Sequence, residues 1–303
     1  LLLKPDKQSL AYRAIDAACK ARQLSPARLL LACGQFATPL QLHQELFAQE
    51  HFPKGLDAAF PQVELERAIA SLLLHINTLD QAAVEAFSID DSSTTEIDDA
   101  LSLSISYAAD GQTINELSLG VHIAVPALLL TPESRWDAMA RERMSTVYAP
   151  GQKIQMLPEA IVRCFSLDEG KLCPALSLYV RFNGQCEVVG EETKLERVKI
   201  RANLRHDQLE SSIDEQVIED WERAVWPKAV LAEDLMQALG QLWRISKRLQ
   251  AERETVRGRP EPRFRSDFHF RIQDDRVEIE QRRRDAPLDR IVAEMMILAN
   301  SRW

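Results

Sequence analysis

Five acidic residues lie within ten positions of this 303-residue chain: Asp90, Asp91, Glu96, Asp98 and Asp99. No Lys or Arg lies among them. Carboxylates packed this closely repel one another, so a positive partner is expected to offset the cost. A divalent cation is the simplest candidate, because hard ions such as Mg²⁺ bind carboxylate oxygens and keep positions open for water and substrate phosphate. The spacing therefore predicts a metal site.

Two strands are expected to position these acids. Residues 86–89 are typical of a short strand that ends at Asp90, and residues 100–105 alternate with period two like a second strand. The other acids then lie on the connecting turn. In an extended chain Glu96 and Asp98 point to one side and Asp99 to the other, so one ion can reach all three only if the chain bends near Ile97. The Ser and Thr residues at 92–95 suit such a bend, because their hydroxyls bond local backbone.

The acidic run has two other possible interpretations. An EF-hand loop starting at Asp90 requires Gly at its sixth position and Glu at its twelfth, where this chain has Thr95 and Leu101, so it is excluded. A solvated acidic loop without a ligand is the second alternative. The apolar segments on both sides of the run count against it.

The run also resembles a known signature. Ile-Asp, five residues, an acid, one residue and Asp-Asp-Ala, at positions 89–100, resembles the catalytic signature of the RNB domain of ribonuclease II and R type exoribonucleases. Further motifs of that family follow in the family's order and at about its spacing, at positions 121–124, 148–151, 156–158, 174–177 and 290–296. The resemblance covers about residues 84–303, and several motifs in register make it specific.

The resemblance implies a 3′-to-5′ exoribonuclease that hydrolyses single-stranded RNA to nucleoside 5′-monophosphates with Mg²⁺ or Mn²⁺. By the family's pattern the catalytic and metal-binding acids are Asp90, Glu96, Asp98 and Asp99. Asp90 and Asp99 are expected to bind the metal directly, Asp98 to lie near the scissile group, and Glu96 to bind directly or through water. Attack by water on a phosphodiester needs an activated water and charge relief at the leaving oxygen, which carboxylate-held metal ions provide.

The chain departs from the family at two positions. Glu96 stands where most members carry Asp, and its extra methylene moves the carboxylate by roughly a bond length, enough to disturb octahedral Mg²⁺. Val125 stands where many members have Asp after the His-Ile-Ala run. The alternative function is therefore a catalytically impaired RNA-binding or protein-interaction module on an RNB scaffold. A divalent-dependent phosphodiesterase acting on DNA or short oligonucleotides is a third hypothesis.

The resemblance also suggests RNA-binding residues. Tyr148 matches a tyrosine that packs on the 3′ base, and the alternative is a core tyrosine beside a Pro-Gly turn. Glu294 matches a glutamate that helps read the sugar, which suits a carboxylate accepting from a 2′-OH, and the alternative is an exposed ion pair with Arg290. His206 stands where relatives often place a tyrosine on the sugar side, and the alternative is a surface histidine on a loop.

Two basic segments were considered as RNA contacts. The side chains of Arg197, Lys199 and Arg201 share one strand face, which predicts either a phosphate track or, slightly favoured, a solvated edge strand protected by charge. The arginines between 253 and 265 are expected to follow a long helix and to interleave with Phe264. An Arg-rich irregular segment with an aromatic suits a strand-binding channel in which Phe264 stacks on a base, and a mobile basic loop is the alternative.

Composition limits the class of protein. The net charge of −9 and isoelectric point of about 5.3 do not by themselves indicate a nucleic-acid binder. The five cysteines lack any C-x-x-C pairing, so neither a zinc site nor a disulfide framework is predicted. No apolar run has the length of a transmembrane helix. We expect a soluble, cytoplasmic protein.

The pattern divides the chain near residue 80. Residues 1–80 are expected to form a helical, helix-turn-helix or winged-helix-like module plus a connector, with a helix over about 8–22 and further helices after Ser25-Pro26 and Thr38-Pro39. Residues 81–303 are expected to form the first part of an α+β, mixed-sheet RNB catalytic domain. Its longest helix is predicted over about 229–254. A last helix from 288 still carries its apolar stripe at Trp303, so we expect the chain to stop within that domain.

Overall fold

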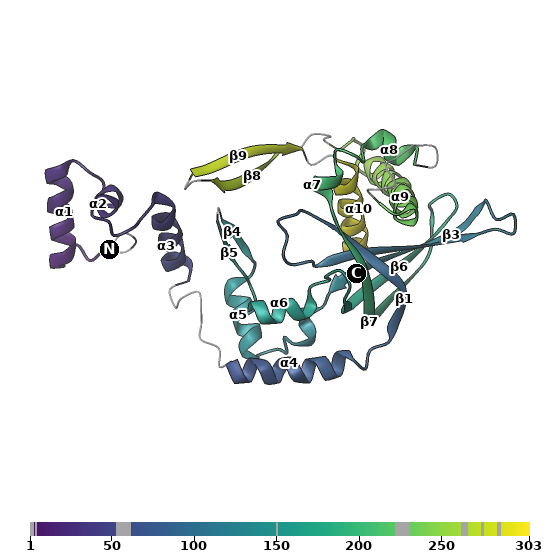
Figure 1. The fold of residues 1–303 in the computed structure, drawn as a ribbon, viewed down its shortest axis with the longest axis horizontal. Helices are drawn as coiled ribbons and strands as arrows, with labels where there is room; N and C mark the ends of the chain where they lie inside the picture. Colours follow the sequence, from purple (N-terminus) through teal and green to yellow (C-terminus); the bar gives the residue numbers. More distant parts are fainter. Residues whose placement is uncertain are drawn as a thin grey trace. The chain divides into compact units, whose positions relative to one another are not determined.

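The computed structural model describes residues 3, 5–52, 62–149, 151–221, 231–261, 266–273, 276–283 and 286–303. The fold consists of two compact units (Figure 1). The first comprises Leu1–Leu65, Ser145–Met156 and His269–Glu280, and the second comprises Glu66–Met144, Leu157–Phe268 and Gln281–Trp303.

Three short helices begin the first unit: α1 (Leu10–Arg22), α2 (Pro26–Ala32) and α3 (Pro39–His51). Each begins at an N-cap residue, Ser9, Ser25 and Thr38 in turn, whose hydroxyl accepts the backbone N–H of the residue three positions later. The predicted helix starts are confirmed, because a hydroxyl at this position satisfies an otherwise unpaired amide. The strands β4 (Val147–Ala149) and β5 (Gln152–Ile154) form an antiparallel pair in the same unit.

A closed barrel forms the centre of the second unit (Figure 1). Its strands follow the order β1 (Gln81–Asp90), β2 (Asp99–Tyr107), β3 (Ile114–Ala124), β6 (Leu172–Asn183) and β7 (Val188–Arg205). The first four neighbouring pairs are antiparallel, and β7 closes the barrel by pairing in parallel with β1. The mixed sheet confirms the predicted α+β class.

The barrel strands contribute to two hydrophobic clusters. The small side chains of Ala86, Ala100 and Ala175 pack with Ile97 and Val198 in one cluster. The larger cluster includes Phe87 and Leu101 from the strands and Trp243 from helix α9 (Glu233–Arg257). Ala86 and Phe87 are sequence neighbours in different clusters because successive strand residues point to opposite faces.

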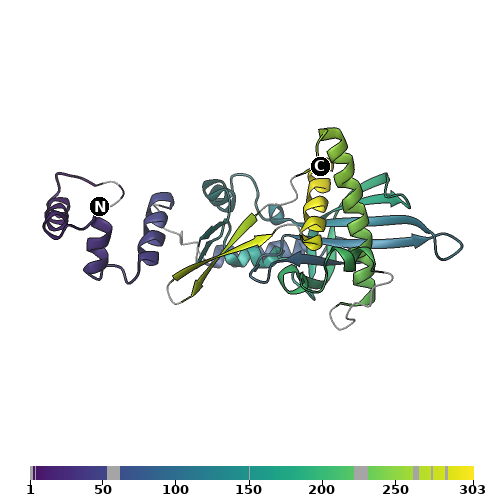
Figure 2. The ribbon, with the colours of Figure 1, turned by 90° about the horizontal axis from the view of Figure 1, so that it is seen from above.

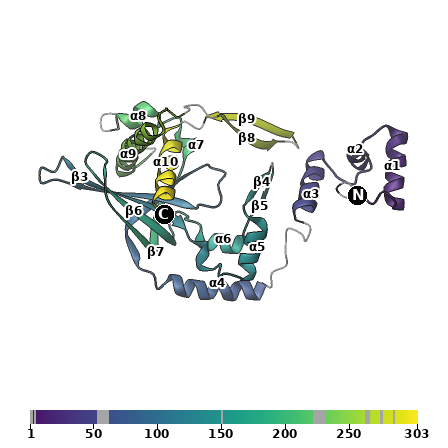
Figure 3. The same cartoon turned by 180° about the vertical axis from the view of Figure 1, so that it is seen from behind.

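Helix α10 (Pro287–Arg302) packs beside α9 against the barrel, as Figures 2 and 3 show. Both contribute buried side chains, with Trp243 from α9 and Ile291 and Met295 from α10 at most 1% exposed. The remaining helical elements are α4 (Gln62–Ile76), η1 (Pro126–Leu128), α5 (Arg135–Arg143), α6 (Glu159–Phe165), α7 (His206–Leu209) and α8 (Glu215–Glu219). A two-stranded sheet pairs β8 (Ser266–Gln273) with β9 (Arg276–Arg283).

Three expectations about elements need correction. The segment containing Arg197, Lys199 and Arg201 is not an edge strand, because β7 is hydrogen-bonded to β6 on one side and β1 on the other. Helix α9 ends at Arg257, three residues later than predicted. Arg253 and Arg257 therefore lie within the helix and not after it. The strand expected over residues 86–89 begins five residues earlier, because β1 spans Gln81–Asp90. Phe264 lies outside the described residues.

None of the helices in the described part of the chain combines the length and the apolar character that a bilayer crossing requires.

Candidate metal centre

Two adjacent strands bring the ends of the acidic run together. Asp90 is the last residue of β1 and Asp99 is the first of β2, and the register pairs Phe87 with Leu101. In the neighbouring strands Asp90 faces Arg205 of β7 and Asp99 faces Ile123 of β3. The remaining acids lie on the connection between the strands, as the sequence predicted.

Ile97 anchors the connection. Its side chain is 2% exposed and packs in the cluster that contains Ala100 and Val198. Its backbone N–H donates to Ser166 Oγ at 3.1 Å, and its carbonyl accepts from the N–H of Leu167 at 2.9 Å. A single buried residue therefore fixes the chain between Glu96 and Asp98, at the position where the sequence required a bend.

Side chains also hold the start of the connection. The carboxylate of Asp91 accepts the N–H of Ser93 at 2.8 Å and its hydroxyl at 2.6 Å. The hydroxyl of Ser92 donates to the carboxylate of Asp207, and the guanidinium of Arg205 donates to the carbonyl of Asp91 at 2.9 Å. The hydroxyls of Ser92 and Ser93 thus bond carboxylates, where the sequence predicted bonds to local backbone.

The pKa values of two acids in this group are raised. Burial, then the charges of Asp90 and Asp98, raise the pKa of Asp99 to about 6. Burial also raises the pKa of Asp90, opposed by a hydrogen bond from Ser88 and by the charge of Arg205. Within the described residues the buried Oδ2 atom of Asp90 has no hydrogen-bond partner. Converging carboxylates with an orphaned buried oxygen fit a bound cation, because such a group otherwise carries an uncompensated desolvation cost.

The structure thus brings Asp90, Asp98 and Asp99 into one electrostatic group. Asp98 is exposed, and its carbonyl accepts from the N–H of Ala124 at 2.8 Å. Glu96 lies on the same connection with a half-buried side chain. Oxygen-only ligands of this kind suit Mg²⁺ and Mn²⁺.

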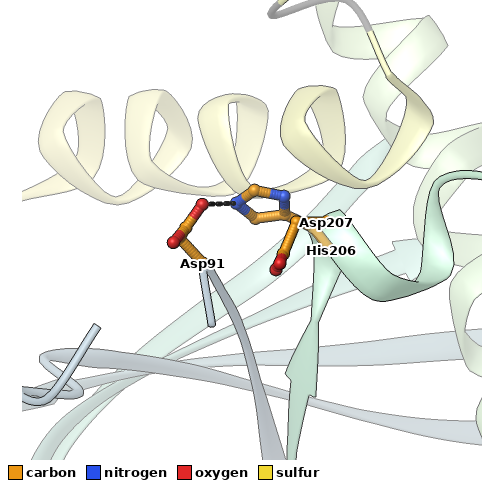
Figure 4. A group of neighbouring side chains, drawn as sticks. All are labelled: Asp91, His206 and Asp207. Carbon is orange, nitrogen blue, oxygen red and sulfur yellow. Dashed lines mark ion pairs between the residues drawn. The ribbon is translucent and has the colours of Figure 1, made fainter. Parts of the chain in front are cut away.

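A second group of possible ligands combines one acid of the run with two residues of α7 (Figure 4). Asp91, His206 and Asp207 each offer one ligand atom within 4.8 Å of the others. The Nε2 atom of His206 lies 3.9 Å from a carboxylate oxygen of Asp91 and 4.0 Å from one of Asp289. His206 begins α7 and is 8% exposed, so it is not the surface loop histidine that the sequence allowed. The group was missed from the sequence, although Asp91 and Asp207 both adjoin predicted site residues.

Glu294 is 6% exposed and pairs with Arg253, whose Nη1 and Nη2 atoms lie 2.6 and 2.5 Å from its carboxylate oxygens. Arg253 also binds Glu261 at 3.0 Å. The predicted alternative, an exposed pair of Glu294 with Arg290, is wrong. The guanidinium of Arg290 lies 4.6 Å from the ring centroid of Trp243 instead.

Tyr148 lies in the first unit, on β4. It is 73% exposed, which excludes the interpretation as a core tyrosine. The ammonium of Lys153 lies 5.5 Å from its ring centroid.

Residues 79–303 match the family described as RNB domain. The chain belongs to the RNB domain family. Over 231 residues it is 32% identical to a Vibrio cholerae serotype O1 (strain M66-2) protein named Exoribonuclease 2, covering 73% of this chain and 31% of that protein. The chain therefore spans about a third of the length of this RNB relative.

Solved structures give the same fold. An RNase R of Mycoplasma genitalium, solved in complex with ribose methylated single-stranded RNA, superimposes with a TM-score of 0.57 at 15% identity, covering 80% of this chain and 36% of that one. A Dss1 exoribonuclease from Candida glabrata gives a TM-score of 0.60 at 17% identity, covering 82% of this chain and 31% of that one. The closed barrel with its acidic strand ends is therefore the RNB fold.

Proposed function

We propose that this chain carries the acidic centre of a metal-dependent 3′-to-5′ exoribonuclease that hydrolyses single-stranded RNA to nucleoside 5′-monophosphates. One observation carries the proposal: carboxylates end two neighbouring strands, where burial and then the charges of Asp90 and Asp98 raise the pKa of Asp99 to about 6. The buried Oδ2 of Asp90 has no partner among the described residues. The kinship with proteins named Exoribonuclease 2 points to RNA as the substrate.

Asp90 and Asp99 are the proposed direct ligands of Mg²⁺ or Mn²⁺, because burial raises the pKa of both and they lie at the ends of two neighbouring barrel strands. A divalent ion held there supplies charge relief for the scissile phosphate and lowers the pKa of a bound water. Asp98 is exposed and is proposed to lie near the scissile group, while the half-buried Glu96 is proposed to bind the metal directly or through water.

Contacts to RNA are proposed on the same basis. The exposed ring of Tyr148, with Lys153 beside it, can stack on a base while the ammonium attracts phosphate. Glu294 is proposed to accept from a 2′-OH, which requires the RNA to take the place of Arg253. His206 is proposed on the sugar side, and Phe264 stays a prediction from the sequence.

The test is a time course on 5′-labelled single-stranded oligoadenylate in Mg²⁺, Mn²⁺ or EDTA, with products resolved by length. Shortening to a small limit fragment in either metal, abolished by EDTA and by Asp99→Asn, supports the proposal. An unchanged strand in both metals contradicts it.

The alternative is an RNA-binding module without turnover. It is favoured by one observation, the pairing of Glu294 with Arg253, which occupies the carboxylate proposed for the sugar. Binding of the same labelled strand, measured by fluorescence anisotropy, separates the two functions. Retained affinity with no shortening in Mg²⁺ or Mn²⁺ identifies the binder.

A further inference from the structure

Hydrogen bonds link the side-chain amide of Asn203 both to β1, which ends at Asp90, and to the residues that hold Ile97. Asn203 lies on β7, where the register pairs it with Ser88 of β1. Its Nδ2 atom donates to Ser88 Oγ at 2.8 Å and to the carbonyl of Leu167 at 3.0 Å. Its Oδ1 atom accepts the N–H of Glu169 at 2.7 Å. The bonds to Leu167 and Glu169 fix the orientation of the amide, because a carbonyl can only accept and an N–H can only donate.

The first connection leads to Asp90. Ser88 is fully buried, and its hydroxyl lowers the pKa of Asp90. The Ser88 oxygen accepts from Asn203, which leaves its single proton available for the Asp90 carboxylate. Ser88 and Asp90 lie two residues apart in β1 and share one strand face. The amide therefore orients the hydroxyl that orients the carboxylate.

The second connection leads to the segment that carries Glu96, Asp98 and Asp99. The carbonyl of Leu167 accepts from Asn203, and the N–H of Leu167 donates to the carbonyl of Ile97 at 2.9 Å. Ser166, the preceding residue, accepts the N–H of Ile97. Ile97 is the buried anchor of that segment, so a displacement of residues 166–167 is transmitted to the acids on both sides of it.

We propose that Asn203 is a positioning residue of the metal centre, which sets Asp90 through Ser88 and the segment around Ile97 through Leu167. The inference deepens the proposed function and rests on it. Partners that orient metal-binding carboxylates typically change metal affinity by about 10–100-fold when removed. Asn203 is half-buried, and its amide uses both Nδ2 protons and an Oδ1 lone pair in hydrogen bonds, which suits this role.

The experiment compares Asn203→Ala, Ser88→Ala and the double variant with the wild-type chain. Mn²⁺ affinity is measured by electron paramagnetic resonance of the free ion, without RNA. We expect Asn203→Ala to weaken Mn²⁺ binding by about 10–100-fold and Ser88→Ala to weaken it less, because only the first disturbs both connections. The double variant should bind as Asn203→Ala does, since both act on Asp90 through one route.

Asn183→Ala is the matched control. The amide of Asn183 organises the turn between β6 and β7 in a similar way, donating to Glu187 and accepting the backbone N–H groups of Gln185 and Glu187. It makes none of the described contacts to the acidic centre. We expect it to lower the melting temperature with unchanged Mn²⁺ affinity.

Turnover on oligoadenylate adds a readout that a purely structural role would not move. With Asn203→Ala the Mn²⁺ concentration for half-maximal rate should rise, while the rate at saturating Mn²⁺ stays closer to the wild type. Equal Mn²⁺ affinity in wild type, Asn203→Ala and Ser88→Ala overturns the inference, as does an equal loss in Asn183→Ala. Failure of the wild type itself to bind Mn²⁺ is distinct, because it overturns the proposed function and the inference with it.

Discussion

The guanidinium of Arg253 and the carboxylate of Glu294 form a two-bond ion pair that links α9 to α10, with N···O distances of 2.5 and 2.6 Å. The Glu294 side chain is 7% exposed and that of Arg253 is 22% exposed. The contact with Glu294, then with Glu261, raises the pKa of Arg253, so the guanidinium is charged at every accessible pH. The pair joins the two helices that cover the barrel.

Arg253→Met is expected to destabilise the protein by about 3 kcal/mol, because it leaves the Glu294 carboxylate buried and unpaired. The measurement is urea unfolding at pH 7. Arg248→Met is the control on the same helix, since the Arg248–Glu252 pair is about half exposed and its loss should cost less than about 0.5 kcal/mol. Equal midpoints for the two variants would contradict the prediction.

Asp99→Asn is expected to stabilise the metal-free protein at pH 8 while abolishing stabilisation by Mn²⁺. Because the folded chain raises the pKa of Asp99 from 3.8 to about 6, ionisation of this carboxyl costs stability as the pH rises through that window. The neutral amide should add about 1–3 kcal/mol at pH 8 and little at pH 3.5. Thermal unfolding in EDTA and in Mn²⁺ measures both effects.

Asp110→Asn is the opposing control for that experiment. Hydrogen bonds from Thr113 and Gln112 lower the pKa of Asp110, so its ionised form stabilises the fold and the amide should reduce stability at pH 8. A destabilised Asp99→Asn variant in EDTA at pH 8 would refute the account of repulsion among the acids.

His122 is expected to stay neutral well below pH 6. It is fully buried in the barrel, its Nε2 and Nδ1 atoms each lie 2.8 Å from a hydroxyl, of Ser102 and Ser177, and burial lowers its pKa to about 4. The unfolded chain binds this proton from pH 6.5 downward and the folded chain only near pH 4. This group therefore contributes stability that is complete above pH 6.5 and falls by up to about 3 kcal/mol toward pH 4.

Nuclear magnetic resonance of the imidazole nitrogens during a pH titration isolates this histidine from Asp99, which titrates in the opposite sense for stability. A His122 transition near pH 6.5 would show that the ring is accessible to protons and would contradict the buried network.

Glu96→Asp is expected to increase turnover in Mg²⁺ relative to turnover in Mn²⁺. Shortening the side chain by one methylene moves the carboxylate toward the backbone by roughly a bond length. Mg²⁺ demands stricter octahedral geometry than the more adaptable Mn²⁺, so it should respond more to this change. The ratio of initial rates in the two metals measures the effect, with Asp98→Glu as the reciprocal variant. An unchanged ratio would place Glu96 outside the ligands.

The strand ends could be predicted from the sequence because period two is a local property. The alternation around residues 100–105 and the apolar run before Asp90 predicted β1 and β2 and placed the acids between them. Caps at Ser25 and Thr38 likewise predicted helix starts, since the hydroxyl and the amide it binds lie three residues apart. The family signature came from the spacing of the same acids.

Which distant residues contact one another could not be predicted from the sequence. Asn203 and Ser88 are 115 positions apart, and Arg253 and Glu294 are 41 apart, so only the folded chain decides that they meet. The sequence favoured a local pair of Glu294 with Arg290 and an edge strand at 197–201. Closure of the barrel overturned the edge strand, because parallel pairing of β7 with β1 joins segments more than a hundred residues apart.

The sequence by itself therefore determined that an acidic run connects two strands and to which family the chain belongs, because these follow from residue type and short-range spacing. Only the tertiary structure decided which carboxyls repel, which buried oxygen has no partner among the described residues, and which distant amide is hydrogen-bonded to Ser88 and Leu167. These properties depend on burial and on contacts between separate strands, since desolvation and hydrogen bonding are set by what packs around a group in space.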